Sequence, residues 1–164
     1  MEKMEFEPLV GFGKVKFGMT QSEVEAILGK ANEVLKDEPF GEDEDDYVTI
    51  LNYYELGLSL SFDKVEDYRL TDIMTDGECN IGLPGGIKVG MTEAAFKKAA
   101  PKSDMGPFDE LDMTEESFDE GNDENLSGYE FYDAGITVYF KEGILDTIQM
   151  GPEFDDNDEV VWPK

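Results

Sequence analysis

The sequence predicts an α+β fold of two tandem repeats, each a short helix packed on an antiparallel β-meander. Three observations predict it: a Gly-Met-Thr segment occurs twice, apolar residues at helical spacing follow each copy, and short strand patterns with glycine turns follow each helix. We expect one extended sheet or two adjoining sheets, with the helices on one face. The predicted organisation is a first repeat (1–76), a Gly/Pro-rich connector (77–86), a second repeat (87–152) and an acidic tail (153–164).

The first predicted helix begins after Thr20, whose hydroxyl can accept from free N–H groups of the first turn. Glu23 stands three residues later, where its carboxylate can reach back to the Thr20 N–H and complete a capping box. Apolar residues then recur at helical spacing, and Gly29 suits the left-handed conformation that ends helices. The apolar residues are Val24, Ile27 and Leu28.

The second predicted helix begins after Thr92, at the same offset from Thr20 as Gly90 has from Gly18. Ala95 occupies the position where a capping box needs Glu, so this helix has a weaker start. The apolar stripe comprises Phe96, Ala99 and Ala100, and Pro101 takes the place of the stopping glycine. Met19 and Met91, one residue before each cap, are expected to pack into the core.

The strand patterns of the first repeat cover residues 47–54, 58–62 and 69–75, with a short fourth strand at 32–36. An acidic loop is expected at 37–46 and a polar turn at 63–68. The second repeat has matching patterns at 129–132, 136–140 and 143–150. Between its helix and strands, residues 102–127 are predicted to form an irregular acidic segment, with a brief helical turn near 114–118. Trp162 is expected to pack back onto the body of the protein.

Because one helix covers only one face of a sheet, each repeat leaves its other face open. Strand alternation and strand order place five candidate partner-binding residues near this face: Tyr53, Ser59, Ser61, Thr137 and Tyr139. The alternative interpretation is an ordinary solvated face on which aromatic side chains pair across strands.

Forty acidic and 13 basic residues give a net charge of −27, which repels nucleic acids and anionic membranes and attracts basic proteins. The acidic segments 37–46, 109–124 and 153–159 admit three interpretations. They form a surface for a basic partner, bind calcium through their many carboxylates, or are solvated loops that keep the protein soluble. For the first interpretation, the candidate partner-binding residues are Asp43, Asp45, Asp119 and Asp123.

The chain has no His, which excludes imidazole bases, Ser-His or Cys-His nucleophiles and His-ligated metals. The single Cys79 allows no internal disulfide and is expected to be buried and inert. No phosphate-binding glycine loop, nucleophile elbow or metal-binding cysteine spacing occurs. We therefore expect no catalytic residues, no metal and no cofactor. No apolar run is long enough for a signal peptide or a membrane span, so a cytoplasmic location is expected.

Phe17-Gly18-Met19-Thr20 with the helix pattern to Gly29, and again Val89-Gly90-Met91-Thr92, each precede a β-meander. This layout resembles the two-repeat β-lactamase inhibitor protein-like fold, and it is similar to the single units of small outer-membrane assembly lipoproteins. The resemblance implies a module that binds another protein on its concave sheet and performs no chemistry. With one cysteine, the chain lacks the disulfides of the secreted inhibitors. Its acidic character is more similar to that of bacterial immunity proteins.

Together, these observations predict a non-catalytic, cytoplasmic inhibitor or immunity protein that neutralises a basic toxin or enzyme through an acidic surface. The competing interpretation is a structural or assembly adaptor of the same fold, delivered to the cell envelope, in which the charge is incidental.

Overall fold

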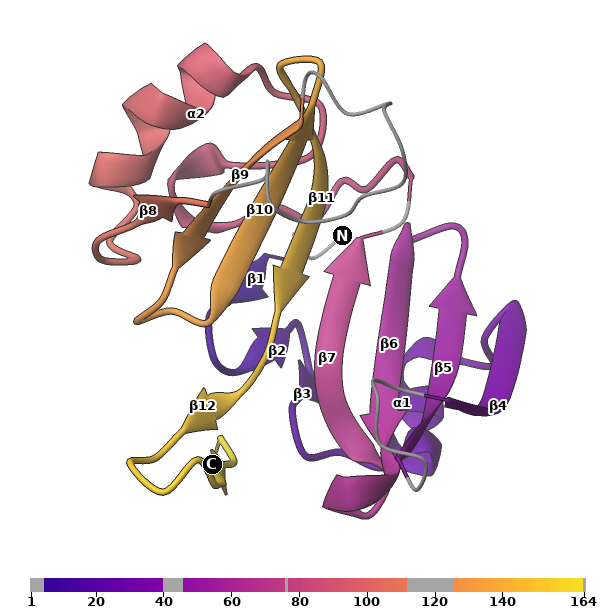
Figure 1. The fold of residues 1–164 in the computed structure, drawn as a ribbon. Coiled ribbons are helices and arrows are strands. Elements are labelled where there is room, and N and C mark those ends of the chain that lie inside the picture. The colour runs from indigo at the N-terminus through magenta and orange to yellow at the C-terminus, as the bar shows by residue number, and fades with distance from the viewer. Residues whose placement is uncertain (1–4, 40–45, 76, 112–125, 164) are drawn as a thin grey trace.

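The computed structural model describes residues 5–39, 46–75, 77–111 and 126–163. The described residues form an α+β fold in which an eight-stranded antiparallel sheet carries two short helices (Figure 1). The sheet strands are β4 (Glu33–Pro39), β5 (Tyr47–Tyr53), β6 (Leu58–Asp63), β7 (Arg69–Thr75), β8 (Asp109–Glu110), β9 (Leu126–Phe131), β10 (Ile136–Lys141) and β11 (Ile144–Met150). The helices are α1 (Gln21–Leu28) and α2 (Glu93–Ala99).

The strand order is β4-β5-β6-β7-β11-β10-β9-β8, so the two halves of the chain join at the centre of one sheet. At this junction Met74 of β7 lies opposite Gln149 of β11, and Ile73 lies opposite Met150. The buried Thr75 hydroxyl accepts a hydrogen bond of 2.9 Å from the Ile148 backbone N–H. The prediction offered one extended sheet or two adjoining sheets, and the structure has one.

Helix α1 has the predicted boundaries and the predicted capping box. The Thr20 hydroxyl accepts from the Glu23 N–H, and the Glu23 carboxylate accepts from the Thr20 N–H at 3.0 Å. Gly29 ends the helix with φ of 85°, a conformation that a residue with a Cβ adopts only with strain. The Tyr53 hydroxyl donates to the Gly29 carbonyl oxygen at 2.8 Å, which ties the end of the helix to β5.

Helix α2 begins at Thr92, whose hydroxyl accepts from the Ala95 N–H without a reciprocal carboxylate. Its first residue, Glu93, instead accepts hydrogen bonds from the hydroxyls of Tyr129 and Ser127 on β9. Burial, followed by the bond to Glu93, raises the pKa of the Tyr129 hydroxyl. Pro101 lies within a 3₁₀ turn, Ala100–Lys102, that continues directly from the helix.

Both helices pack on the same side of the sheet, and the core lies beneath them. Fully buried Phe96 of α2 contacts the rings of Tyr129, Phe131 and Phe140 from the neighbouring strands. Val24 of α1 is equally buried in the core cluster. In each central strand alternate residues enter this core: Leu58, Leu60 and Phe62 on β6, and Ile136, Val138 and Phe140 on β10.

The remaining short strands form two further small sheets. β1 (Phe6–Glu7), β2 (Gly11–Phe12) and β3 (Val15–Lys16) form a small antiparallel sheet. β12 (Glu153–Phe154) and β13 (Val160–Val161) form a hairpin in the segment predicted as an acidic tail. Trp162 beyond this hairpin packs against the core, as predicted, and the Arg69 guanidinium lies 5.7 Å from its ring centroid.

Several local predictions are confirmed and others need correction. Met19 and Met91 pack against the core, and Cys79 is buried with a thiol pKa raised mainly by desolvation. The acidic loop expected from residue 37 begins later, because β4 extends to Pro39. The segment 102–127 is not wholly irregular, since it contains β8 and the start of β9. The helical turn expected near 114–118 lies outside the described residues. Neither described helix has the length and apolar character that crossing a bilayer requires.

Candidate functional site

The sheet surface opposite the helices is the candidate site, and we call it the open face. Cross-strand register aligns one side chain from each of the eight strands in a single row over this face. The row is Glu33, Asn52, Ser59, Met74, Gln149, Thr137, Glu130 and Asp109. It is polar apart from Met74 and has carboxylates toward both ends, while no Lys or Arg stands in it. This row therefore carries three carboxylates, from Glu33, Glu130 and Asp109, and no basic group.

Hydrogen bonds fix the side chains at the β4 end of this row. The Asn52 side-chain amide donates to the Glu33 carboxylate at 2.9 Å, and the Ser59 hydroxyl donates to the side-chain oxygen Oδ1 of Asn52. The Tyr54 hydroxyl also donates to Glu33, at 2.8 Å, and these two bonds lower the pKa of the Glu33 carboxyl. Glu33 is consequently held ionised at one edge of the open face.

An apolar pocket of about 370 Å³ opens on β4, β5, β6 and β7. Its apolar lining comes from Leu35, Val48, Ile50 and Met74. On the opposite side lies Asp72, whose carboxylate accepts a hydrogen bond of 3.0 Å from the Gln149 amide. Burial raises the pKa of the Asp72 carboxyl to about 6, and the bond from Gln149 opposes this shift only in part.

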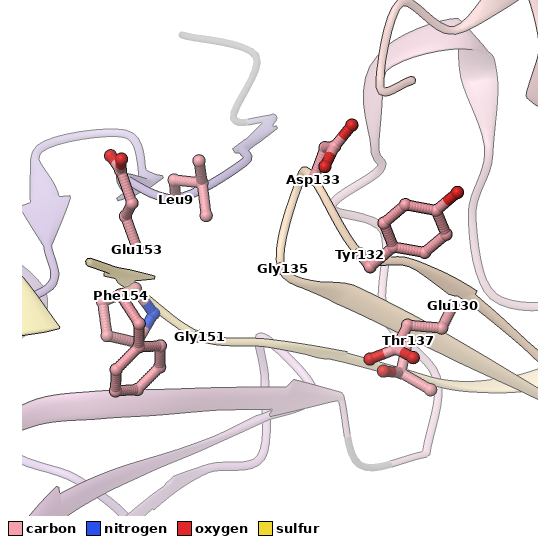
Figure 2. Close-up of a pocket in the computed structure, with 10 residues that line it drawn as sticks. Leu9, Glu130, Tyr132, Asp133, Gly135, Thr137, Gly151, Glu153 and Phe154 are labelled. Atoms are coloured by element: carbon pink, nitrogen blue, oxygen red, sulfur yellow. The ribbon is translucent and has the colours of Figure 1, made fainter. Parts of the chain in front are cut away.

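A second pocket of about 490 Å³, the acidic pocket, lies at the turn between β9 and β10 (Figure 2). Three exposed carboxylates line it, from Glu130, Asp133 and Glu153. Two exposed aromatic residues also line it: Tyr132 is 51% exposed and Phe154 is 57% exposed. No basic residue is among the ten that line it. Carboxylates beside aromatic rings are suited to bind a cation.

The two pockets lie next to each other on the open face. Thr137 in the acidic pocket is the cross-strand neighbour of Gln149, which lines the apolar pocket. In Figure 2, Thr137 and Glu130 lie together beneath the β9–β10 turn, while Glu153 and Phe154 come from the segment beyond Gly151. The acidic pocket therefore depends on the C-terminal segment as well as on the sheet.

The structure places four of the predicted partner-binding residues on the open face. Ser59 and Ser61 lie in the apolar pocket, Thr137 in the acidic pocket, and Tyr139 opposite Thr147 on the neighbouring strand. Desolvation, followed by the charges of Glu130 and Asp72, raises the pKa of the Tyr139 hydroxyl. These four residues are half-buried; Ser59, Ser61 and Thr137 each line one pocket, and Tyr139 lines neither.

The placement of Tyr53 was wrong. Its side chain points toward the helices and is 5% exposed, because it lies opposite the core residue Leu58 in the register of β5 and β6. Strand order alone could not have shown this, whereas counting alternate positions from Leu51 would have placed Tyr53 in the core. The other four predicted residues, Asp43, Asp45, Asp119 and Asp123, lie outside the described residues.

A carboxylate pair lies at the β6 end of the open face. Burial, and then a hydrogen bond with Asp46, raise the pKa of the Asp63 carboxyl to about 6. The Asp46 Oδ1 atom is buried without a hydrogen-bond partner. In the described part of the chain, no group of three or more acidic or cysteine side chains could hold a metal ion.

Sequence reasoning missed Asp72, Gln149, Glu130, Tyr132 and Phe154. Glu130 follows from alternation in β9, but the other positions depend on a bulge, a turn and the C-terminal hairpin. No family model matches the chain, and no curated protein or solved structure matches it either.

Proposed function

We propose that the protein is a non-catalytic binding module that uses its open face to inhibit or neutralise a basic protein, such as a toxin or an enzyme. The observation that carries the proposal is the acidic pocket, which is lined by three carboxylates and two exposed aromatic side chains and by no basic residue. A Lys or Arg side chain from a partner would meet opposite charge and an aromatic surface there. The net charge of −27 would also speed the encounter with a cationic partner.

We further propose that the chain consists of two tandem units of one design, and equivalent hydrogen bonds support this. The Gly18 N–H donates to the Leu70 carbonyl oxygen, and the Leu70 N–H donates to the Met19 carbonyl oxygen. In the second half the pattern is the same: the Gly90 N–H donates to the Leu145 carbonyl oxygen, and the Leu145 N–H donates to the Met91 carbonyl oxygen.

Irregularities in the strands support the same proposal. β6 and β7 shift register between Ser61 and Phe62, and β10 and β11 shift register between Tyr139 and Phe140. These positions correspond when the Gly57 and Gly135 turns are aligned. A bulge retained at the same position in both halves favours duplication over chance, because bulges are specific features of a strand pair.

A tandem arrangement suits binding because it doubles the width of the sheet while both helices cover one side. The other side is then wide enough to present two adjacent pockets to one partner. We propose a cytoplasmic location for this module, since its single cysteine, Cys79, is buried and forms no internal disulfide.

The test is affinity capture from the source lysate at low and high salt, followed by kinetics with the purified captured protein. The key variant combines Glu130→Gln, Asp133→Asn and Glu153→Gln, which removes the charges of the acidic pocket. The matched control combines Glu55→Gln, Glu78→Gln and Glu142→Gln, three exposed residues outside both pockets. Both triple variants lose the same net charge, so they separate a local site from general attraction.

We expect one basic protein to be captured specifically, with association that slows as salt rises. The pocket variant should weaken its binding at least tenfold, and the control by less than threefold. Equal weakening by both variants, or capture of all cationic proteins alike, would show that only the total charge acts. Such a result would remove the proposed site.

A further inference from the structure

We propose that the apolar pocket is an anchor site for one lysine side chain of the partner, with the aliphatic stem on the apolar wall and the ammonium at Asp72. This inference rests on the proposed function and names what the neighbouring pocket of the same face recognises. It commits to a single occupant, a primary alkylammonium group.

The order of side chains across four strands shapes the apolar pocket. Leu35, Ile50, Ser61 and Asp72 are successive cross-strand neighbours on β4, β5, β6 and β7. Adjacent strands are about 4.8 Å apart, so Ile50 and Asp72 are separated by about 10 Å across β6. The residues on β6 in this space are the small Ser59 and Ser61. The space between the apolar wall and the carboxylate therefore remains open.

The charge of Asp72 is not balanced by any residue that lines the pocket. Asp72 accepts a hydrogen bond from the neutral Gln149 amide, and none of the nine residues that line the pocket is basic. Burying a carboxylate without a cation is costly. Burial raises the pKa of Asp72 to about 6, which leaves the group mostly ionised at neutral pH. A cation from a partner would offset this cost, whereas a neutral apolar side chain would increase it.

The hydrogen bonding of Asp72 favours lysine over arginine. The Gln149 amide donates to Asp72 Oδ1 and competes with a partner's donor at that oxygen, so a group that needs only Oδ2 binds with less competition. A guanidinium binds a carboxylate best through two parallel hydrogen bonds, which needs both oxygens. An ammonium is a compact charge on a flexible four-carbon stem and is satisfied by one carboxylate oxygen together with the nearby hydroxyls of Ser59 and Ser61.

The experiment titrates the full-length protein with n-butylammonium, the side-chain mimic of lysine, and with n-butanol as its neutral counterpart. Methyl NMR signals of Ile50 and Met74 report occupancy of the pocket. The key variant is Asp72→Asn, which keeps an oxygen that can accept from Gln149. The matched control is Asp146→Asn, an exposed residue of β11 that does not line the pocket. A second variant, Ser61→Leu, fills the space over β6.

We expect saturable shifts with butylammonium in the millimolar range, with at least fivefold weaker binding in Asp72→Asn and unchanged binding in Asp146→Asn. Ser61→Leu should abolish the response. Equal binding of butanol, or no effect of Asp72→Asn, would make the pocket a neutral apolar anchor and overturn the proposal. The absence of saturable shifts with both probes would also overturn the proposal. Shifts that depend on protein concentration alone would overturn it as well, because a second copy of the chain would then occupy the pocket.

The outcomes also separate this inference from the proposed function. If a basic partner binds through the acidic pocket but butylammonium does not bind, only the lysine anchor falls. If butylammonium binds at Asp72 but no basic partner is captured, the proposed function falls and the amine site remains.

Discussion

Asp72 lies in an environment that disfavours its ionised form. Its carboxyl is buried beside apolar side chains on the open face, and burial raises its pKa from 3.8 to about 6. In the unfolded chain the group regains its ordinary pKa. Between these two values the folded state holds more protons than the unfolded state, so this residue makes the free energy of unfolding fall as pH rises from about 4 to about 6.

We therefore predict that Asp72→Asn flattens the pH dependence of stability in this window. A shift of about two pKa units corresponds to about 3 kcal/mol, so the wild type should lose up to that amount relative to Asp72→Asn between pH 4 and pH 6.5. Urea unfolding at several pH values measures the difference. Asp146→Asn serves as control and should follow the wild type. Parallel curves for the wild type and Asp72→Asn would mean that the carboxyl is not buried in solution.

Tyr53 and Tyr139 show when strand alternation predicts the face of the sheet that a side chain occupies. Alternation within β10 placed Tyr139 correctly, because apolar residues mark every other position of that strand. In β5 most residues are buried on both faces, since Val48 and Asn52 line a pocket while Leu51 and Tyr53 enter the core. A strand that is buried on both sides carries a weaker alternation signal, and the aromatic side chain was assigned to the wrong face.

Among the elements, the helices were the most predictable, because their signals are local. The capping residues Thr20 and Thr92 and the ending Gly29 depend on neighbours within one or two turns. The lining of the apolar pocket was less predictable. The bulge at Ser61/Phe62 places Leu70 and Ile73, three positions apart, on the same core face. Simple alternation along β7 therefore does not show which face of the sheet Asp72 occupies, and no short-range sequence pattern predicts the bulge.

The two helix starts provide a direct test of capping. α1 has a complete capping box, whereas α2 has Ala95 at the position of the reciprocal acceptor. We predict that Ala95→Gln stabilises the protein by about 0.5 kcal/mol, because the Gln amide oxygen can accept from the Thr92 N–H. Gln avoids adding to the net charge of −27. Thermal and urea unfolding measure the change.

The control for this variant is Ala94→Gln, one position earlier in the same helix and exposed to a similar degree. It adds the same side chain without access to the cap. If both variants shift stability equally, the gain comes from helix propensity and the capping explanation fails.

The C-terminal hairpin is positioned by the close contact of Trp162 with Gly18. A Cβ added at Gly18 would lie 2.9 Å from the Trp162 ring, whereas one at the corresponding Gly90 would meet nothing within 4 Å. Both glycines have positive φ, 95° and 99°. We predict that Gly18→Ala and Gly90→Ala each cost about 1–3 kcal/mol through backbone strain. Only Gly18→Ala should displace the single tryptophan.

Tryptophan fluorescence under native conditions distinguishes the two variants. Gly18→Ala should shift the Trp162 emission to longer wavelength, and Gly90→Ala should leave it unchanged. An unchanged spectrum in Gly18→Ala would mean that the hairpin does not pack on the first half in solution.

At the scale of the whole molecule, the two halves share one sheet and one core. The sheet is continuous through β7 and β11, and Trp162 from the end of the chain packs near Gly18 and Arg69 of the first half. The net charge of −27 opposes this compact state through self-repulsion. The central junction must therefore supply enough stabilisation to keep the halves together, and the buried bond between Thr75 and the Ile148 N–H is part of it.

We predict that the protein unfolds in a single transition, with Trp162 fluorescence and far-ultraviolet circular dichroism giving the same urea midpoint. Thr75→Val should lower the free energy of unfolding by about 1–3 kcal/mol, because it leaves the Ile148 N–H buried without an acceptor. Thr75→Ser keeps the hydroxyl and should recover most of this loss, allowing for the missing methyl group. Two separated transitions in the wild type would show that the halves fold independently. In that case the open face would be two small surfaces rather than one wide enough to hold a partner across both pockets.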